Sequence, residues 1–161
     1  MAIEYRVAKP TDLKELVPLV EAYAREQQAQ VPINTLTGNF MEFARSGIAQ
    51  AVEHPAACVM VAEDLAGPGP RIVGYVVGMV QEPPPIFESE MYTFVSDLFV
   101  DPAYRRQGIA TALVERVRGW GWVKGINRLS LVLPVNSSAL GLYKKLGFAP
   151  IQTMLYYKDG V

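Results

Sequence analysis

Cysteine and histidine are scarce, since the 161 residues contain one of each, Cys58 and His54. A lone cysteine excludes an internal disulfide and is typical of a reducing compartment. One cysteine and one histidine are also too few for a zinc site built from these side chains, so no metal is expected. Cys58 lies in the apolar run Ala56–Val61, which predicts a buried small side chain and not a nucleophile.

An excess of one charge sign and long hydrophobic runs are missing as well. The 15 basic and 16 acidic residues give a net charge of −1, whereas nucleic-acid-binding domains usually carry a basic excess. No stretch of about 18 residues, the length that a membrane-spanning helix needs, is free of charges and turn signals. The segment Met1–Arg6 has no apolar signal core. We therefore expect neither nucleic acid nor a membrane as partner, and a cytoplasmic location.

The composition that remains is globular, with 50% hydrophobic and 19% charged residues. The length suits one domain over residues 1–161, which is long enough to bury about 70% of the surface of the unfolded chain. No internal repeat or linker divides the sequence.

Hydrophobic periodicity predicts strands and helices in the order β-α-α-β-β-β-α-β-α-β. The strands are expected at Ile3–Ala8, Ala57–Glu63, Arg71–Gln81, Met91–Val100, Arg128–Pro134 and Gln152–Tyr157. The helices are expected at Asp12–Gln28, Phe40–Glu53, Ile109–Val117 and Asn136–Leu146. Gly74 and Gly78 within one strand indicate a bulge or the close approach of another segment.

The segment Phe94–Thr111 has the pattern of a strand, a tight loop and the start of a helix. The first amides of a helix have no intrahelical partner, and their partial positive charge suits a phosphate. Gly108 lets a ligand approach the backbone, and Arg105 and Arg106 can add charge-assisted contacts. The P-loop and Rossmann glycine patterns are both absent, which disfavours a nucleoside triphosphate or a dinucleotide in their usual folds.

Two motifs together resemble a known family. The run Arg105-Arg106-Gln107-Gly108-Ile109-Ala110 is similar to the [Q/R]-x-x-G-x-[G/A] signature of the GNAT N-acetyltransferases. It follows Asp97–Pro102 at the spacing of that family, and the second family hallmark is present at Asn136–Phe148. The resemblance implies a mixed α/β (α+β) fold, with a mostly antiparallel central sheet of six to seven strands flanked by four helices. Strands 94–100 and 128–134 are expected to run parallel and to splay apart.

The resemblance also implies acetyl-CoA as the acetyl donor. The backbone of Leu98, Phe99 and Val100 would contact the pantetheine arm, and Asn136 would hydrogen-bond that arm. The pyrophosphate would lie at the loop and helix start formed by Arg105, Arg106, Gln107, Gly108, Ile109, Ala110 and Thr111. Tyr143 would lie near the thioester sulfur.

Acetyl transfer needs an amine that has lost a proton and an acid for the departing thiolate. A tyrosine stays protonated at neutral pH, so Tyr143 is the predicted catalytic acid. Tyr143 follows Asn136 by two turns of the predicted helix, which would place both side chains on one face toward one cofactor.

The general base is left unassigned by the sequence. Polyamine-type relatives have a glutamate immediately before the Asp-aromatic pair of this strand, and Ser96 occupies that place here. Asp97 is expected on the opposite face from Ser96, and Glu90 lies about 20 Å away along an extended strand. A water relay remains open. Because no nucleophile accompanies the motifs, we expect direct attack in a ternary complex.

The acceptor is expected to be a small-molecule amine or a peptide amine. Its pocket is predicted from the loops Gln27–Leu36 and Glu82–Glu90 and the chain end, with aromatic lining from Tyr92, Phe94, Tyr156 and Tyr157. Two alternatives are a non-catalytic acyl-CoA-binding regulatory module and a small nucleic-acid-binding domain. The latter would use Arg105, Arg106, Arg116, Arg118 and Lys124. A homodimer through an edge strand at Gln152–Lys158 is compatible with such a fold.

Overall fold

The computed structural model of the chain describes residues 2–31, 35–86, 88, 90–152 and 154–155. The strands are β1 (Ile3–Val7), β2 (Ala57–Asp64), β3 (Arg71–Gln81), β4 (Tyr92–Val100) and β5 (Leu129–Leu131). The helices are α1 (Leu13–Gln30), α2 (Phe40–Glu53), α3 (Ile109–Val123) and α4 (Leu140–Lys145), with short 3₁₀ turns at Pro10–Asp12 and Pro102–Tyr104. The sheet order is β1-β2-β3-β4-β5, antiparallel throughout except for the parallel pair β4 and β5. The predicted fold class is confirmed.

The predicted number of six to seven strands is wrong for the described residues, which form five. Of the predicted last strand at Gln152–Tyr157, Gln152, Met154 and Leu155 adopt no regular structure, and the other residues lie outside the described ones. A strand needs a neighbour for its backbone groups. The described residues of this segment pair with no strand, and Ile151 and Leu155 are 91% and 90% exposed, so side-chain packing does not hold the segment against the sheet either.

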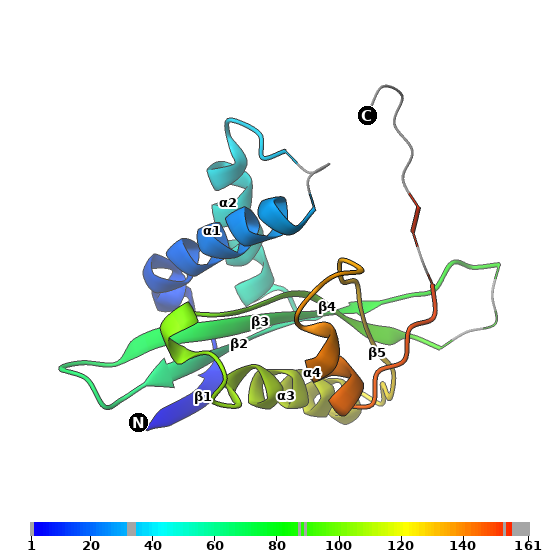
Figure 1. Cartoon of the computed structure of the whole chain (residues 1–161). Helices are drawn as coiled ribbons and strands as arrows, with labels where there is room; N and C mark the ends of the chain where they lie inside the picture. The colour runs from blue at the N-terminus through cyan, green and yellow to red at the C-terminus, as the bar shows by residue number, and fades with distance from the viewer. Residues whose placement is uncertain (1, 32–34, 87, 89, 153, 156–161) are drawn as a thin grey trace.

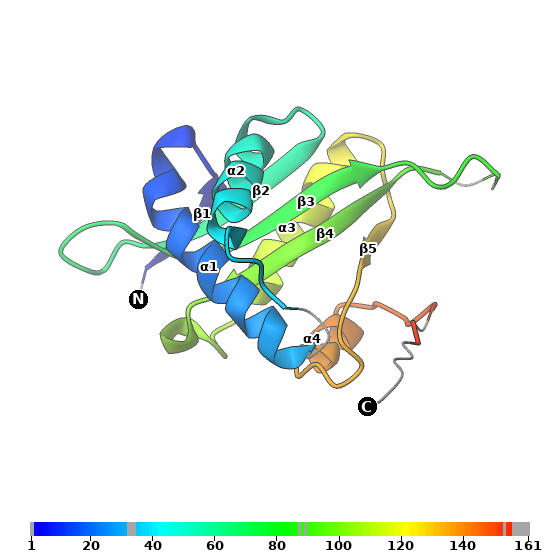
Figure 2. The same cartoon turned by 90° about the horizontal axis from the view of Figure 1, so that it is seen from above.

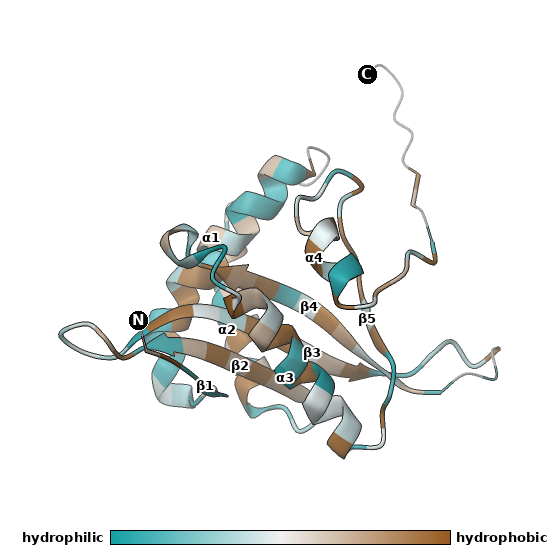
Figure 3. Cartoon of the chain, turned by 60° about the horizontal axis from the view of Figure 1, so that its bottom comes forward, coloured by the Kyte–Doolittle hydropathy of each residue, from teal (hydrophilic) through white to brown (hydrophobic). Residues whose placement is uncertain are grey.

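Helices cover both faces of the sheet, as predicted (Figure 1). α1 and α2 pack on one face, with a core that includes Leu16, Val61, Tyr75 and Phe99. α3 packs on the other face, where its Leu113 and Val117 lie in one apolar cluster with Val76 of β3 and Val95 of β4. Figure 3 shows the apolar residues gathered on the central strands. None of the helices in the described part of the chain is long and apolar enough to cross a bilayer.

α3 reaches Val123, beyond the predicted end at Val117, although two glycines lie in its last turns. A Cβ on Gly121 would lie 2.6 Å from Thr93 Oγ1, and a Cβ on Gly78 of β3 would lie 2.5 Å from Val117 Cγ1. These glycines therefore allow the helix and the sheet to approach closely. The interpretation of Gly78 as a point of close approach is confirmed.

β4 and β5 pair only over Thr93–Val95 and Leu129–Leu131 and then separate. Seen from above, β5 runs away from β4 toward α4, while the end of α1 lies above the opening (Figure 2). The predicted strand Arg128–Pro134 is consequently shorter, because residues 132–134 have left the sheet. The predicted parallel and splayed arrangement is confirmed.

A cluster of three charged side chains links β1 to β2 and to the 3₁₀ turn before α1. Arg6 of β1 contacts Asp12 at 2.7 Å and Glu63 of β2 at 2.8 Å, and all three side chains are at most 22% exposed. Asp12 also accepts a hydrogen bond from the Lys9 amide at 2.7 Å. Hydrogen bonds from Arg6 lower the pKa of both carboxyl groups.

We predict that Arg6→Met destabilises the protein by about 2 kcal/mol at pH 7, because two largely buried carboxylates lose their partner. The folded-state pKa of each carboxyl lies below its unfolded value, so this stability is present above the unfolded pKa and is lost as the pH falls. Thermal melts should therefore show a smaller difference between the two proteins near pH 3 than at pH 7. Arg71→Met is the control, since the pair of Arg71 with Asp101 has a 62% exposed arginine and should contribute less than about 1 kcal/mol. Equal losses in the two variants would contradict the prediction.

Candidate functional site

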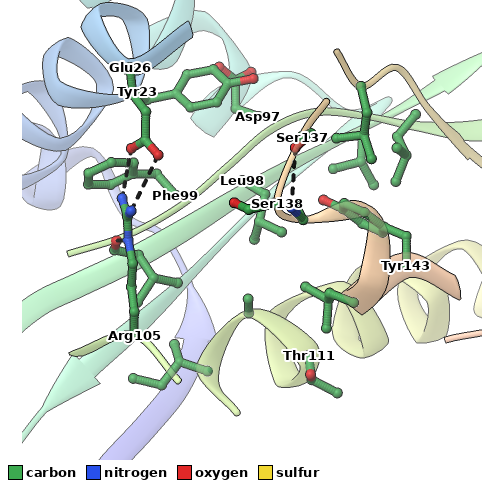
Figure 4. A pocket seen from close by; sticks show the side chains of 18 of the residues that line it. Tyr23, Glu26, Asp97, Leu98, Phe99, Arg105, Thr111, Ser137, Ser138 and Tyr143 are labelled. Atoms are coloured by element: carbon green, nitrogen blue, oxygen red, sulfur yellow. Dashed lines mark hydrogen bonds and ion pairs between the residues drawn. The ribbon is translucent and has the colours of Figure 1, made fainter. Parts of the chain in front are cut away.

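A cavity of about 570 Å³ lies where β4 and β5 separate. Its walls come from the second half of α1, from β4 after the point of separation, from the loop and first turn of α3, and from the segment between β5 and α4. Figure 4 shows these side chains converging on one space. The parting of two parallel strands thus leaves a slot whose sides are supplied by distant parts of the chain.

One end of the cavity is formed by the loop before α3. Arg106 and Gly108 both have positive φ, 64° and 82°, so the backbone turns sharply just before the helix begins at Ile109. Among the described residues no group accepts a hydrogen bond from the amides of residues 106–111. A Cβ on Gly108 would meet no atom within 4 Å. Unpaired amides beside open space form a suitable cradle for a phosphate.

Arg105, one of the expected phosphate contacts, lines the cavity and also has partners within the protein. Its guanidinium donates to Glu26 of α1 at 2.7 and 3.3 Å and to the Val100 carbonyl at 2.9 Å. It also lies 5.4 Å from the centre of the Phe99 ring. Arg105 therefore ties α1 to the loop across the cavity (Figure 4). Arg106 also lines the cavity and, within the described residues, forms no ion pair.

Tyr143 of α4 lies on the opposite wall. Its side chain is 5% exposed and packs edge-on against Phe148, with ring centres 5.3 Å apart. The hydroxyl points into the cavity (Figure 4), and no described residue hydrogen-bonds to it. Burial raises the pKa of Tyr143 to about 12. The cavity therefore receives a neutral hydroxyl that is free to donate.

Asn136 does not share a helix face with Tyr143, so the predicted two-turn relation is wrong. α4 begins at Leu140, and Asn136 is exposed in a turn outside the cavity. Before the helix, the Ser137 amide donates to the Pro134 carbonyl at 2.9 Å, and Ser137 Oγ accepts from the Ala139 amide at 3.2 Å. Such local serine bonds compete with helical ones and delay the helix start. Ser137 and Ser138 line the cavity in place of Asn136.

The structure brings all but two of the sequence-predicted cofactor residues to this cavity; Gln107 and Asn136 are the exceptions. Those that line it are Leu98, Phe99, Val100, Arg105, Arg106, Gly108, Ile109, Ala110, Thr111 and Tyr143. The prediction missed Tyr23 and Glu26 of α1, and it assigned Gln27 and Gln30, which also line this cavity, to the acceptor loop. Their spacing of three, four and seven residues places them on one helix face, a signal that was present in the sequence.

A second cavity, of about 320 Å³, lies between α1, α2 and β4. Gln27, Gln28, Thr35 and Leu36, from the loop expected to hold the acceptor, line it. The described part of Glu82–Glu90 lines neither cavity and extends beyond the end of the sheet (Figure 1). Tyr92 and Phe94 line neither cavity, and Tyr156 and Tyr157 lie outside the described residues.

A β-bulge at Ser96 shapes the boundary between the two cavities. Asp97 pairs with Val77 and Val95 with Gly78, so Ser96 has no partner on β3. Bulges are over-represented beside active sites, where they redirect side chains. Ser96 Oγ donates to Asp97 Oδ2 at 2.6 Å, and the Tyr23 hydroxyl donates to the Ser96 carbonyl at 3.1 Å. Burial raises the pKa of Asp97.

Comparison with known proteins agrees with this geometry. Residues 22–148 match the Acetyltransferase (GNAT) family. The chain belongs to this family. The match includes all lining residues of the larger cavity and those of the smaller cavity except Val20.

Individual GNAT relatives are similar in sequence to this chain over only part of its length. The thialysine N-epsilon-acetyltransferase of Bos taurus is 35% identical over 100 residues, 59% of this chain and 57% of that one. The aminoglycoside N(6')-acetyltransferase type 1 of Salmonella typhimurium is 29% identical over 72 residues, 44% and 50% of the respective chains. The chain thus spans about half the length of these relatives. A predicted acetyltransferase of Clostridium acetobutylicum, solved with acetyl-CoA, shares the fold with a TM-score of 0.76 at 18% identity, covering 98% and 96% of the chains.

Proposed function

We propose that this GNAT protein is an acetyl-CoA-dependent N-acetyltransferase that acetylates a primary amine. The observation that carries the proposal is the larger cavity, which joins unpaired amides at the start of α3 to the Tyr143 hydroxyl along the open edge of β4. A long ligand with phosphates at one end and a reactive group at the other suits this arrangement.

The residues present fit acetyl-CoA. The loop at residues 106–111 offers free amides, a residue without Cβ and the cation of Arg106 to a pyrophosphate. The backbone of Leu98, Phe99 and Val100 has no partner strand on the side facing β5, although the Val100 carbonyl already accepts from Arg105, and it offers hydrogen bonds to the amides of a pantetheine arm. When bound, acetyl-CoA supplies an acetyl group activated as a thioester. The role expected for Asn136 loses support, because its exposed side chain lies outside the cavity.

Tyr143 is the proposed catalytic acid. Its pKa of about 12 keeps it protonated at neutral pH, so its hydroxyl can donate a proton to the departing thiolate. Packing against Phe148 holds the ring, and the hydroxyl reaches the cavity without competition from a described partner. A fixed, unpaired donor needs little reorganisation during the reaction.

We further propose that the amine attacks directly in a ternary complex, with no acyl group passing through the enzyme. Neither cavity is lined by a cysteine, and burial raises the pKa of the Cys58 thiol to about 11. The overall reaction converts an ammonium ion and a thioester into an amide, a thiol and one proton released to solvent. The names of the aminoglycoside and thialysine relatives support an amine acceptor of small-molecule size.

Calorimetric titration with acetyl-CoA, CoA and NAD tests the proposal. We expect micromolar binding of acetyl-CoA and CoA and no binding of NAD. Acetylation of any amine, followed by release of free thiol, would then separate an enzyme from a regulatory module that only binds acyl-CoA. Folded protein that binds neither acetyl-CoA nor CoA would overturn the proposal.

A further inference from the structure

The two cavities meet at three shared residues, Tyr23, Gln27 and Asp97. Tyr23 and Gln27 lie on α1, and Asp97 follows the bulge of β4. Figure 4 shows the Tyr23 and Asp97 side chains close together at one side of the larger cavity. The Asp97 carboxyl therefore lies at the point where the two cavities meet.

The lining of the smaller cavity is mostly apolar and carries little charge. Val20, Ala24, Leu36 and Ala44 form its apolar wall. Gln28 and Thr35 add neutral polar groups, and Asp97 is the only ionisable carboxylate among the described lining residues. Such a cavity accommodates an apolar body and one positive charge, and it offers no counter-charge for a second.

Only one of the two carboxyl oxygens of Asp97 has a hydrogen-bond partner among the described residues. Oδ2 accepts from Ser96 Oγ at 2.6 Å, whereas Oδ1 has no described hydrogen-bond partner and is not among the buried atoms sealed without one. Both cavities include this residue in their walls. Oδ1 is thus the free acceptor at the point where the cavities meet.

We infer that the smaller cavity binds the acceptor as a small primary amine with one positive charge and an apolar body, and that Asp97 anchors its ammonium group and takes its proton. This inference rests on the proposed N-acetyltransferase function. It assigns the base that neither the sequence motif nor the comparisons supply. It also predicts that this protein prefers an acceptor with one positive charge over an acceptor with several.

The proton transfer is balanced within the site. One N–H proton of the ammonium ion passes to Asp97 Oδ1, leaving a neutral amine with a free electron pair and a neutral carboxylic acid, which later releases that proton to solvent. Burial raises the pKa of Asp97, so its carboxylate is a stronger base than an exposed one. The groups that face it, Tyr23 of α1 and Tyr75 of β3, have a raised pKa because of burial and the Asp97 charge, and remain neutral.

Calorimetry on the CoA-saturated protein tests the inference with two five-carbon probes, pentylamine and cadaverine, which differ by one ammonium group. We expect pentylamine to bind at least tenfold more tightly than cadaverine. Asp97→Asn should weaken pentylamine at least tenfold, whereas Glu53→Gln, an exposed carboxylate of α2 outside both cavities, should not change it. Cadaverine binding as tightly as pentylamine, no binding of pentylamine, or unchanged affinity in Asp97→Asn would each overturn the inference.

A second measurement shows that Asp97→Asn is folded. The folded-state pKa of Asp97 lies above its unfolded value, so the charged carboxylate costs stability once the pH rises through the folded pKa. Asp97→Asn should therefore have a higher Tm than the natural chain at pH 8 and lose that advantage near pH 3. A lower Tm at pH 8 would contradict a half-satisfied buried carboxylate. CoA binding is measured in the same titrations. If the natural chain does not bind CoA, the proposed function is wrong, and the result says nothing against the role of Asp97.

Discussion

Replacing Tyr143 with phenylalanine is expected to lower turnover by about 100-fold while leaving CoA affinity nearly unchanged. The variant removes only the hydroxyl, which points into the cavity and has no described partner (Figure 4). The ring keeps its edge-on contact with Phe148, so the stability of α4 should be preserved. A large loss of kcat without loss of binding is the signature of a group that acts only in the transition state.

Steady-state kinetics with an acetylated amine, together with CoA titration, would measure both effects. Tyr92→Phe is a matched control, because the Tyr92 hydroxyl contacts Gln81 at 3.5 Å and lies outside both cavities. Turnover in Tyr143→Phe equal to that of the control would reject Tyr143 as the acid. At high pH, ionisation of Tyr143 should lower kcat only near its pKa of about 12, which is beyond the stable range of most proteins.

The second large effect is expected for Gly108→Val, which should weaken CoA binding by about 100-fold or more. Gly108 has a φ of 82°, which a β-branched residue adopts only with strain of about 1–3 kcal/mol. The added side chain would also enter the open space beside the free amides, where a Cβ meets no protein atom within 4 Å. Both effects oppose a phosphate at the start of α3.

Gly119→Ala is the control for this variant, because a Cβ at Gly119 within α3 also meets no atom and the φ there is not positive. It should leave CoA binding unchanged and give equal or slightly higher stability. Gly108→Ala distinguishes strain from bulk, since it shares the φ but has a smaller side chain. If Gly108→Val binds CoA as well as Gly119→Ala does, the phosphate assignment is wrong.

The loop before α3 is the part of the site that the sequence predicts best. Its features follow from residues that are neighbours in the chain: a strand, Asp101-Pro102, a glycine with positive φ and an apolar helix start. Arg105 shows the limit of that reasoning. Its partner Glu26 is 79 residues away, so no local pattern reveals that the guanidinium is already engaged.

The prediction that Asn136 and Tyr143 share one helix face was wrong for a local reason, which their spacing of seven residues does not reveal. Ser137 satisfies nearby backbone groups and delays the helix to Leu140. Tyr143 nevertheless reaches the cavity, because the segment after β5 places α4 at its wall. The prediction was therefore wrong about the geometry between the two residues, although Tyr143 still lines the cavity.

The sequence by itself determined the family and the order of the four helices and the five described strands, because periodicity and backbone preference depend on residues close together in the chain. Only the tertiary structure decided where β4 and β5 part, the bulge at Ser96, the position of Asp97 and the meeting of the two cavities. These features depend on the register of β4 against β3 and on α1 packing across the sheet. Such contacts join residues that are far apart in the chain, and they form only when the core is assembled, so local sequence patterns do not predict them.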